Sequence, residues 1–383
     1  MITTHELDIL CRESTRRAIE LNINRPPTEI ALDKSVENAA LIASQVKYLQ
    51  RAKDKLPTLY AARCIIPPRA FEQSSSEATA RDKRMAGGAV LELTCGLGVD
   101  ALYLSKSFER VVTIECNEIL AAIVRENFKR MGVSNVEVVT GTAEEYIARC
   151  QERFDWLYVD PDRRVEGERR VVCLEGCSPN IVELMPRAKE IAPRVGIKCS
   201  PLFDVDEAFR IFGDVRVEVV SLLDECKEVM IYTGAPRAEL AATGVGRFEF
   251  SAPRAEVDNT PYSGEFNPAK YRYLMVVDVA LQKSRLACHA TRPFARMWSG
   301  NGFAFLSEAT ELRYGRLLEI ERIVEYHPRQ LKREFKGTGA EIIMRDFAPS
   351  LTQVREKLGL KSGAQWRLAL TTINGVQYLI VLK

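Results

Sequence analysis

A short glycine-containing segment carries the residue types that let a backbone approach a ligand closely. Residues 91–101 read Leu-Glu-Leu-Thr-Cys-Gly-Leu-Gly-Val-Asp-Ala. Gly96 and Gly98 have no Cβ to obstruct a ligand, so a strand that ends in this turn and opens into a helix suits a nucleoside or phosphate group. With Ala101 the glycines also fit a dinucleotide fingerprint. The segment alone is therefore compatible with a nicotinamide or flavin site, or with a plain turn.

Acidic side chains near this turn add information about the ligand. Glu92 stands four residues before Gly96, where a carboxylate can face the cationic end of S-adenosylmethionine and would repel a pyrophosphate. Glu115 follows Gly96 by 19 residues and can accept hydrogen bonds from two ribose hydroxyls, which does not discriminate between the two cofactors. Asp160 follows a later apolar run, where an S-adenosylmethionine enzyme orients its methyl acceptor and a dehydrogenase needs no such group.

The elements that must position these residues are short apolar runs alternating with helical stretches. Runs of this length separated by helices predict a mostly parallel, doubly wound sheet, and ligands of such sheets bind at the carboxyl ends of the strands. The runs are residues 89–93, 111–115, 136–139, 156–160, 195–198, 215–220 and 229–232.

Different patterns flank this region. Residues 35–50 have helical spacing with Ser35 as a plausible N-cap, which predicts a helical N-terminal region. Residues 246–268 are rich in Pro, Gly, Asn and Ser and suggest a linker or a small irregular module. Near the C-terminus, Asn374-Gly375 predicts a type I′ hairpin between two apolar strands.

The order of these motifs resembles the class I S-adenosylmethionine-dependent methyltransferases. More closely, it is similar to a bacterial, largely Bacteroidetes, family of methyltransferases with a THUMP-like C-terminal domain. The resemblance implies a Rossmann-like seven-stranded α/β sheet, a helical N-terminal region and a C-terminal α+β THUMP-like domain. The segments that carry it are residues 72–80, 93–101, 160–164, 197–201, 225–228, 340–347 and 354–361.

The resemblance also implies which residues contact S-adenosylmethionine. One group surrounds the methionine half of the cofactor, Glu115 contacts the ribose, and Thr142 occupies the position where such enzymes often have an acid for the adenine amine. Glu144 could replace that acid. The residues around the methionine half are Glu92, Thr94, Gly96, Gly98 and Asp100.

The methyl acceptor is expected beside Asp160-Pro161-Asp162, which we interpret as the catalytic motif. Enzymes that methylate exocyclic amines of bases usually have a second proline and an aromatic ring here, whereas this chain has Asp162-Arg163. Arg163 and Arg164 are candidate substrate-binding residues that could clamp a phosphate, or could form internal ion pairs on a solvated loop.

Cys199 ends the fifth apolar run and raises a second chemical possibility. A cysteine near this place attacks the base in cytosine-5 RNA methyltransferases, and Lys198 could lower its pKa. A small buried thiol is the commoner role for cysteine.

Composition limits the classes of protein and of partner. The chain has 383 residues, 46% hydrophobic and 28% charged, which excludes collagen-like, coiled-coil and disordered classes. Scattered cysteines, three histidines and short apolar runs predict a cytoplasmic protein without a metal site or a membrane span. The net charge is +2, but residues 311–383 hold 13 Lys and Arg against 8 Asp and Glu, which leaves −3 elsewhere. A polyanion would therefore bind locally.

These observations predict an S-adenosylmethionine-dependent methyltransferase that modifies a nucleobase of structured RNA, either tRNA or rRNA. A methyltransferase for a protein or a small molecule, and a non-catalytic RNA-binding or assembly factor, remain alternatives. The oligomeric state and the methylated atom do not follow from the sequence. We expect a helical region at 1–85, the catalytic domain at 86–238, a small connecting module at 239–310, for which a ferredoxin-like fold is one option, and the THUMP-like domain at 311–383.

Overall fold

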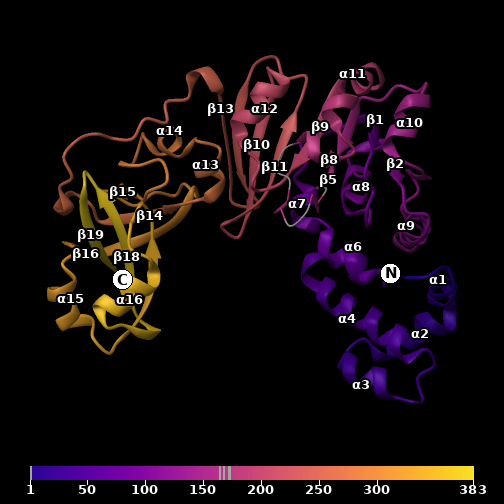
Figure 1. Cartoon of the computed structure of the whole chain (residues 1–383), viewed down its shortest axis with the longest axis horizontal. Coiled ribbons are helices and arrows are strands. Elements are labelled where there is room, and N and C mark those ends of the chain that lie inside the picture. Colours follow the sequence, from indigo (N-terminus) through magenta and orange to yellow (C-terminus); the bar gives the residue numbers. More distant parts are fainter. Residues whose placement is uncertain (1, 164, 167–168, 171–173) are drawn as a thin grey trace. The chain divides into compact units, whose positions relative to one another are not determined.

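The computed structural model describes residues 2–163, 165–166, 169–170 and 174–383 (Figure 1). The chain forms two compact units: residues 1–215 with 229–236, and residues 216–228 with 237–383. Among the described residues, no helix is long and apolar enough to cross a membrane.

The N-terminal region of the first unit is helical and is anchored to the helix that follows the second strand of the sheet. Asn127 of α9 (Glu118–Met131) accepts a hydrogen bond from Ile65 N at 2.8 Å and donates one to Ile65 O at 2.9 Å. Arg130 donates to the carbonyl oxygens of Arg63 and Leu10. The helices are α1 (Thr4–Cys11), α2 (Glu13–Asn22), α3 (Pro27–Leu32), α4 (Ala39–Lys55), α5 (Pro57–Ala61), α6 (Pro68–Gln73) and α7 (Glu77–Arg81).

The predicted helical character of this region is confirmed, but the predicted cap of α4 is wrong. The helix begins at Ala39 after Asn38, and not at Ser35. Both the backbone N–H and the hydroxyl of Ser35 bond to Asp33 Oδ1, at 3.0 and 2.6 Å. This local turn at an aspartate uses the donors of Ser35 before the helix starts.

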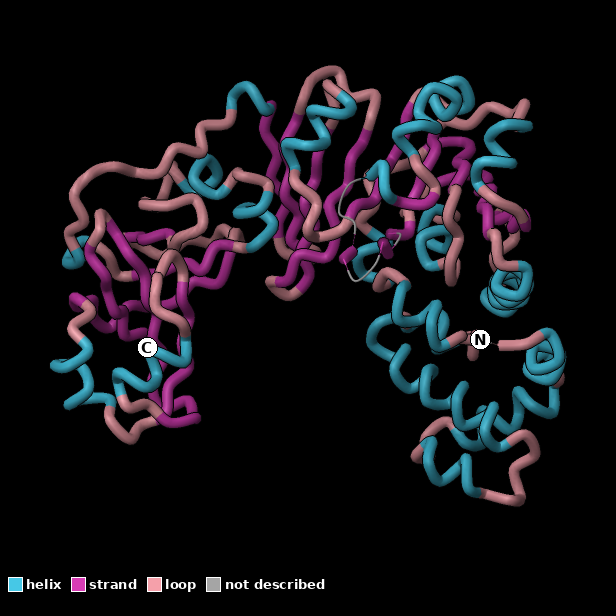
Figure 2. Tube along the Cα trace, in the orientation of Figure 1, coloured by secondary structure: helices cyan, strands magenta, loops and turns pink. Residues whose placement is uncertain are grey.

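A parallel sheet forms the centre of the first unit (Figure 2). The strand order within the unit is β11-β9-β4-β1-β2-β3, and only the pairing of β11 with β9 is antiparallel among these pairs. The chain reverses direction across the sheet between β1 and β4, which is where ligands of doubly wound sheets bind. The strands are β1 (Gly87–Glu92), β2 (Phe108–Glu115), β3 (Val136–Thr140), β4 (Trp156–Val159), β9 (Arg194–Cys199) and β11 (Glu225–Tyr232), whose residues from Val229 onward belong to this unit.

Helices and short strands complete this unit. The sheet strands are connected by α8 (Val99–Leu104), α9, α10 (Ala143–Arg149) and α11 (Ile181–Ile191), and α12 (Val205–Phe212) follows β9. After β4, β5 (Asp162–Arg163) pairs with β8 (Cys177–Ser178), and β6 (Val165–Glu166) pairs with β7 (Arg169–Arg170).

Strand pairing determines which side chains meet at the carboxyl ends. Glu92, the last residue of β1, lies opposite Thr113 of β2 on one side and Tyr158 of β4 on the other. Val159 of β4 pairs with Ile197 of β9, so the following residues of these two strands also lie side by side. The sequence motifs therefore meet at one edge of the sheet.

The second unit begins with β10 (Arg216–Leu222), β12 (Glu239–Gly244) and β13 (Phe248–Pro253). β13 occupies residues where a linker or irregular module is predicted, and it pairs antiparallel with β12. Phe248 and Phe250 lie on the same face of β13 because side chains alternate along a strand, and both contact the ring of Tyr314. This aromatic packing explains why a Gly- and Pro-rich segment contains a strand.

A mixed sheet with order β15-β14-β16-β19-β18-β17 forms the C-terminal part of the second unit. Asn374 (φ 49°) and Gly375 (φ 81°) make the predicted tight turn between β18 and β19. The core on one face includes Phe266, Phe303 and Phe305, and α15 and α16 cover the other face. The elements are β14 (Tyr273–Val277), α13 (Val279–Lys283), α14 (Ala287–Thr291), β15 (Ala304–Leu306), β16 (Gly315–Glu325), α15 (Pro328–Phe335), β17 (Gly339–Met344), α16 (Leu351–Leu358), β18 (Lys361–Ile373) and β19 (Val376–Leu382).

The predicted fold class is confirmed, with a Rossmann-like sheet, a helical N-terminal region and a C-terminal α+β part.

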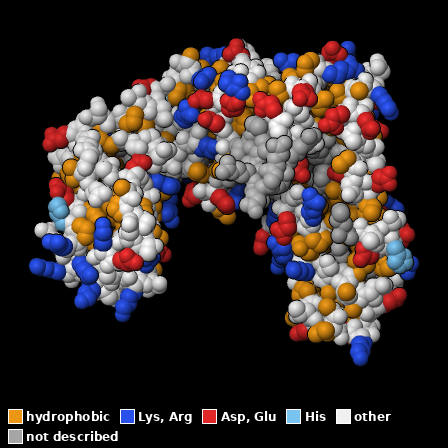
Figure 3. All heavy atoms as spheres, in the orientation of Figure 1, with side chains coloured by type: hydrophobic (Ala, Val, Ile, Leu, Met, Phe, Trp, Pro, Cys, Tyr) orange, Lys and Arg blue, Asp and Glu red, His pale blue; other side chains and the backbone are white. Residues whose placement is uncertain are grey.

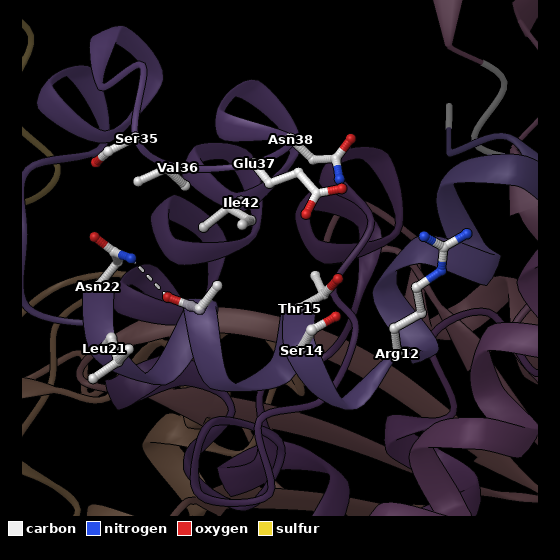
Figure 4. A pocket seen from close by; sticks show the side chains of 11 residues that line it. Arg12, Ser14, Thr15, Leu21, Asn22, Ser35, Val36, Glu37, Asn38 and Ile42 are labelled. Atoms are coloured by element: carbon white, nitrogen blue, oxygen red, sulfur yellow. Dashed lines mark hydrogen bonds between the residues drawn. The ribbon is translucent and has the colours of Figure 1, made fainter.

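A cavity of about 270 Å³ lies in the helical region between α2 and the segment before α4 (Figure 4). Its lining is mixed, with Arg12 and Glu37 beside Leu21 and Ile42, and Asn22 donates to the Ala18 carbonyl along it. Its lining residues all come from the N-terminal helices and the segment between them.

Candidate functional site

The glycine turn after β1 exposes backbone on one side and packs tightly on the other. Gly96 (φ +55°) is exposed, and a Cβ built on it would meet no atom within 4 Å. Gly98 (φ +77°) is buried, and a Cβ there would lie 2.9 Å from Val124 Cγ1 and 3.0 Å from Phe128 Cζ. The positive φ favours glycine at both positions. Gly96 thus offers open backbone to a ligand, whereas Gly98 lets α8 start against α9.

Glu92 presents a buried carboxylate at the end of β1. Its side chain is 0% exposed, and Oε2 accepts a hydrogen bond from the Thr113 hydroxyl at 2.6 Å. Within the described residues, Oε1 has no hydrogen-bond partner. Burial, together with the negative charge of Asp100, raises the pKa of Glu92 well above its usual value. An orphaned buried carboxylate oxygen suits a ligand that brings a positive charge or a hydrogen-bond donor.

Glu115 ends β2 and is held beside the glycine turn. Its Oε2 accepts from Gly96 N at 2.9 Å, and its Oε1 accepts from Asn117 N at 2.9 Å. Burial raises the pKa of Glu115, although both backbone donors favour the ionised form. The carboxylate is only 8% exposed, so its orientation is fixed by the turn that it contacts.

Asp100 lies under the turn between two lysines that the sequence alone did not connect to it. Lys83 Nζ is 3.8 Å from Oδ1 and Lys198 Nζ is 3.6 Å from Oδ2. The hydroxyls of Tyr158 and Ser75 donate to Oδ2, at 2.9 and 3.3 Å. Burial opposes ionisation, but the two ammonium groups and the hydroxyl donors hold the pKa of Asp100 below its usual value. Asp100 is thus a charged component of an internal network.

Asp160 follows β4 and is held at both its backbone and its side chain. Its N–H donates to Thr94 Oγ1 at 2.8 Å, so the residue after β4 is tied to the loop after β1. Its Oδ2 accepts a short hydrogen bond from Lys198 Nζ. The Asp160 side chain remains 36% exposed, whereas that of Lys198 is 12% exposed. Asp160 is the more accessible partner of this ion pair.

The other residues of the predicted acceptor motif are less fully defined. Pro161 is buried and Asp162 is exposed at the start of β5, where it pairs with Ser178. Arg164 and the side chain of Arg163 lie outside the described residues. Their predicted contact with a substrate therefore stays a prediction.

Thr142 has a structural role at the position predicted for the adenine contact. Its hydroxyl accepts from Glu145 N at 3.2 Å and caps α10, and Glu145 completes the capping box. Glu144 is exposed in the first turn of that helix. A contact of either residue with adenine stays a prediction.

Cys199 faces away from the polar cluster. Successive side chains of a strand alternate between its faces, and Lys198 already points at Asp160. The thiol is 6% exposed, and burial followed by the negative charge of Asp160 raises its pKa well above the usual value. Lys198 does not activate this thiol.

Two family profiles match separate segments of the chain. The profile of a methyltransferase domain matches residues 90–162, and the profile of the THUMP domain-like family matches residues 315–383. An S-adenosylmethionine-dependent methyltransferase from Mycobacterium tuberculosis is 24% identical over 336 residues, which are 85% of this chain and 90% of that protein. The chain is an S-adenosylmethionine-dependent methyltransferase with a THUMP-like C-terminal domain.

The fold and partial relatives extend this comparison. A crystal structure of a methyltransferase from Porphyromonas gingivalis W83 superposes with a TM-score of 0.84 at 24% identity, covering 100% of this methyltransferase and 99% of that chain. An RNA methyltransferase from Clostridium acetobutylicum is 30% identical over 35% of this chain and 27% of its own length. A 23S rRNA uracil-C(5) methyltransferase from Edwardsiella ictaluri is 30% identical over 35% of this chain and 29% of its own length.

Sequence reasoning missed Ser75 and Lys83 of the methyltransferase's polar cluster, and it related Lys198 to Cys199 and not to Asp160. Ser75 lies in one of the motifs that carry the family resemblance, but its spacing from Asp100 in the chain gives no sign of contact. Lys198 offers one signal, because a lysine near the end of an apolar strand is rarely buried unless it is paired. Its partner depends on the pairing of β9 with β4, which the sequence does not specify.

Proposed function

We propose that this methyltransferase modifies a nucleobase of structured RNA, with its methyl-transfer site at the carboxyl ends of β1, β2, β4 and β9. The observation that carries the proposal is a buried carboxylate with an orphaned oxygen, Glu92, beside the open backbone of Gly96 and next to an accessible acid, Asp160. These groups lie where the strand order reverses.

The residues present fit S-adenosylmethionine. Glu92 has a buried oxygen that needs a positively charged or hydrogen-donating partner, and the space at Gly96 admits a ligand against the backbone. Glu115 would hold the ribose hydroxyls as an acceptor whose orientation the turn fixes. Thr94 and Asp100 act by holding the surrounding loops. When bound, the cofactor would supply a methyl group to a lone pair of the acceptor, and the pair of the broken carbon–sulfur bond would stay on sulfur.

Asp160 is the residue that would orient the acceptor. An ionised carboxylate only accepts hydrogen bonds, so Asp160 would hold an N–H of a base amine and take up the proton that the amine loses. Pro161 is buried and keeps the backbone after β4 fixed. Asp162 is exposed beside this residue and would contact the same base.

The C-terminal unit supports RNA as the substrate class. Exposed lysines gather where α15 and α16 end (Figure 3). Lys336 Cγ and Lys332 Cε lie 3.2 and 3.5 Å from the position that a Gly359 Cβ would take, and Lys361 follows Gly359 by two residues. Lysine side chains brought together by two helices suit the phosphates of a nucleic acid. The partial relatives that are named RNA methyltransferases favour the same class.

Incubating the protein with methyl-tritiated S-adenosylmethionine and total RNA from a strain that lacks it tests this function. We expect label in RNA, and nucleoside mass spectrometry should place it on a base nitrogen. Label only in protein or small molecules would favour a different substrate class. A 5-methylated pyrimidine would refute the acceptor role of Asp160.

The non-catalytic alternative is tested with Asp160→Ala. If that variant complements a deletion strain as well as the natural protein does, while Lys332→Glu/Lys336→Glu does not, the chain acts by binding RNA and not by methylating it. We expect both variants to fail.

A further inference from the structure

Lys198 links motifs that lie far apart in the sequence. Its ammonium group donates to Asp160 Oδ2 and to Ser75 Oγ, the latter at 2.7 Å, and it lies 3.6 Å from Asp100 Oδ2. These partners follow β4, precede α7 and lie in α8, respectively. One side chain on β9 therefore holds three separate segments at the carboxyl edge of the sheet.

The burial of this lysine argues against an incidental surface pair. Exposed ion pairs contribute little because water and salt screen them. Lys198 is 12% exposed, and a buried ammonium is costly unless it is paired. Asp100 is also close to Lys83, at 3.8 Å, and accepts from Tyr158. Asp100 therefore has other partners that offset its negative charge. For the Asp160 carboxylate, Lys198 is the one side chain among the described residues that bonds to it.

The two carboxylate oxygens of Asp160 differ in their contacts. Thr94 fixes the backbone, Lys198 holds Oδ2, and no described residue bonds to Oδ1. With one oxygen tied to an ammonium that is itself held by Ser75, the carboxylate plane cannot rotate freely. The other oxygen is left to meet the N–H of an acceptor. Placement of this kind matters because a misplacement of about 1 Å can cost roughly 100-fold in rate.

We propose that Lys198 is a positioning residue of the methyl-transfer site, which holds Oδ2 of Asp160 so that Oδ1 faces the N–H of the acceptor amine. This inference rests on the proposed function. It assigns Lys198 to the transfer step and not to cofactor or RNA affinity.

The test compares Lys198→Met and Lys198→Arg with the natural protein and with Lys55→Met. Lys55 is a half-buried lysine of α4 that donates to the Phe71 carbonyl at 2.7 Å, so its replacement controls for loss of a lysine contact outside the site. Three quantities are measured: kcat and KM with the RNA described above, the Kd of S-adenosylhomocysteine by calorimetry, and the melting temperature.

We expect Lys198→Met to lower kcat about 100-fold, while Kd and the KM for RNA change by less than about 3-fold, a difference worth about 0.7 kcal/mol or less. Lys198→Arg should recover most of kcat, because arginine keeps the charge and the donors. Lys55→Met should match the natural protein. In an Asp160→Asn background, Lys198→Met should cause little further loss, because the two residues act as one unit.

Several results would overturn the inference. A Lys198→Met protein with kcat within about 3-fold of the natural value would do so, as would a rise in Kd or KM that accounts for the whole loss. Multiplicative losses in the double variant would also contradict it. Should Lys198→Met not fold, Lys198→Gln is measured in its place, with the same criteria. If the natural protein itself transfers no label to RNA, the proposed function fails and not this inference alone.

Discussion

Replacing Glu92 by Gln removes an ionisable group from the cofactor site while keeping the size of the side chain. The carboxylate is fully buried, its Oε2 accepts from Thr113, and its Oε1 has no partner in the described part of the chain. A glutamine oxygen can still accept from Thr113, so the variant tests the charge and not the packing. Hydrogen bonds to charged groups contribute about 1.5–3 kcal/mol, which corresponds to a roughly 10- to 100-fold weaker Kd.

The assay is calorimetric titration of the natural protein and of Glu92→Gln with S-adenosylmethionine and with S-adenosylhomocysteine. The chain offers a matched control in Glu218, a glutamate of β10 that is 1% exposed and accepts from the Thr243 hydroxyl. Glu218→Gln should leave both Kd values unchanged. If Glu92→Gln binds both ligands within about 2-fold of the natural protein, the assignment of Glu92 to the cofactor is wrong.

The pH dependence of the same pair of proteins provides an independent check. The pKa of Glu92 is raised, so the folded chain binds this proton more tightly than the unfolded chain does, and the free energy of unfolding falls as pH rises above the ordinary glutamate range. Relative to the natural protein, Glu92→Gln should become more stable with rising pH, by up to about 1.4 kcal/mol per unit. Cofactor affinity should show the opposite trend, increasing with pH in the natural protein only. A stability difference independent of pH would show that folding does not raise the pKa of Glu92.

Further variants test the neighbouring parts of the site. Thr94→Val leaves the Asp160 N–H without its acceptor, which costs about 1–3 kcal/mol. We expect kcat to fall while the Kd of S-adenosylhomocysteine stays nearly constant. An unchanged kcat would show that this link between the two loops does not contribute to methyl transfer. Cys199→Ser should keep kcat within about 3-fold, because the buried thiol is not a nucleophile; an inactive variant that folds and binds cofactor would imply a covalent step. Lys332→Glu/Lys336→Glu should weaken RNA binding and reduce the slope of log K against log salt by about 1.5, measured by filter binding; an unchanged slope would place the RNA elsewhere.

The sequence predicts the edge of the sheet where chemistry occurs, because each acid directly follows or ends an apolar strand. Glu92, Glu115 and Asp160 lie at carboxyl ends as predicted, since parallel strands bring those ends together. Their roles toward a cofactor or an acceptor stay predictions. The glycine spacing correctly predicts the turn. It does not predict that the two glycines have different roles, with Gly98 allowing close packing against α9 and Gly96 leaving the backbone open to a ligand.

Contacts across the strands were not predictable. Lys198 contacts Asp160 because β9 pairs with β4 in one register. Ser75 lies near this pair because it follows a helical region that is held in place by Asn127 of α9. Neither register nor docking is encoded in local spacing. The prediction of Ser35 as a helix cap was wrong for a related reason. The spacing of apolar residues does not reveal that Ser35 forms a turn with Asp33 instead.

A crystal structure of the protein with S-adenosylhomocysteine tests the central claim most directly. We expect ligand density against the Gly96 backbone, with an amine or hydroxyl donor at the Glu92 and Glu115 carboxylates and with Asp160 Oδ1 facing the open side. Ligand density at another edge of the sheet, or a Glu92 carboxylate that still lacks a partner in the complex, would contradict it.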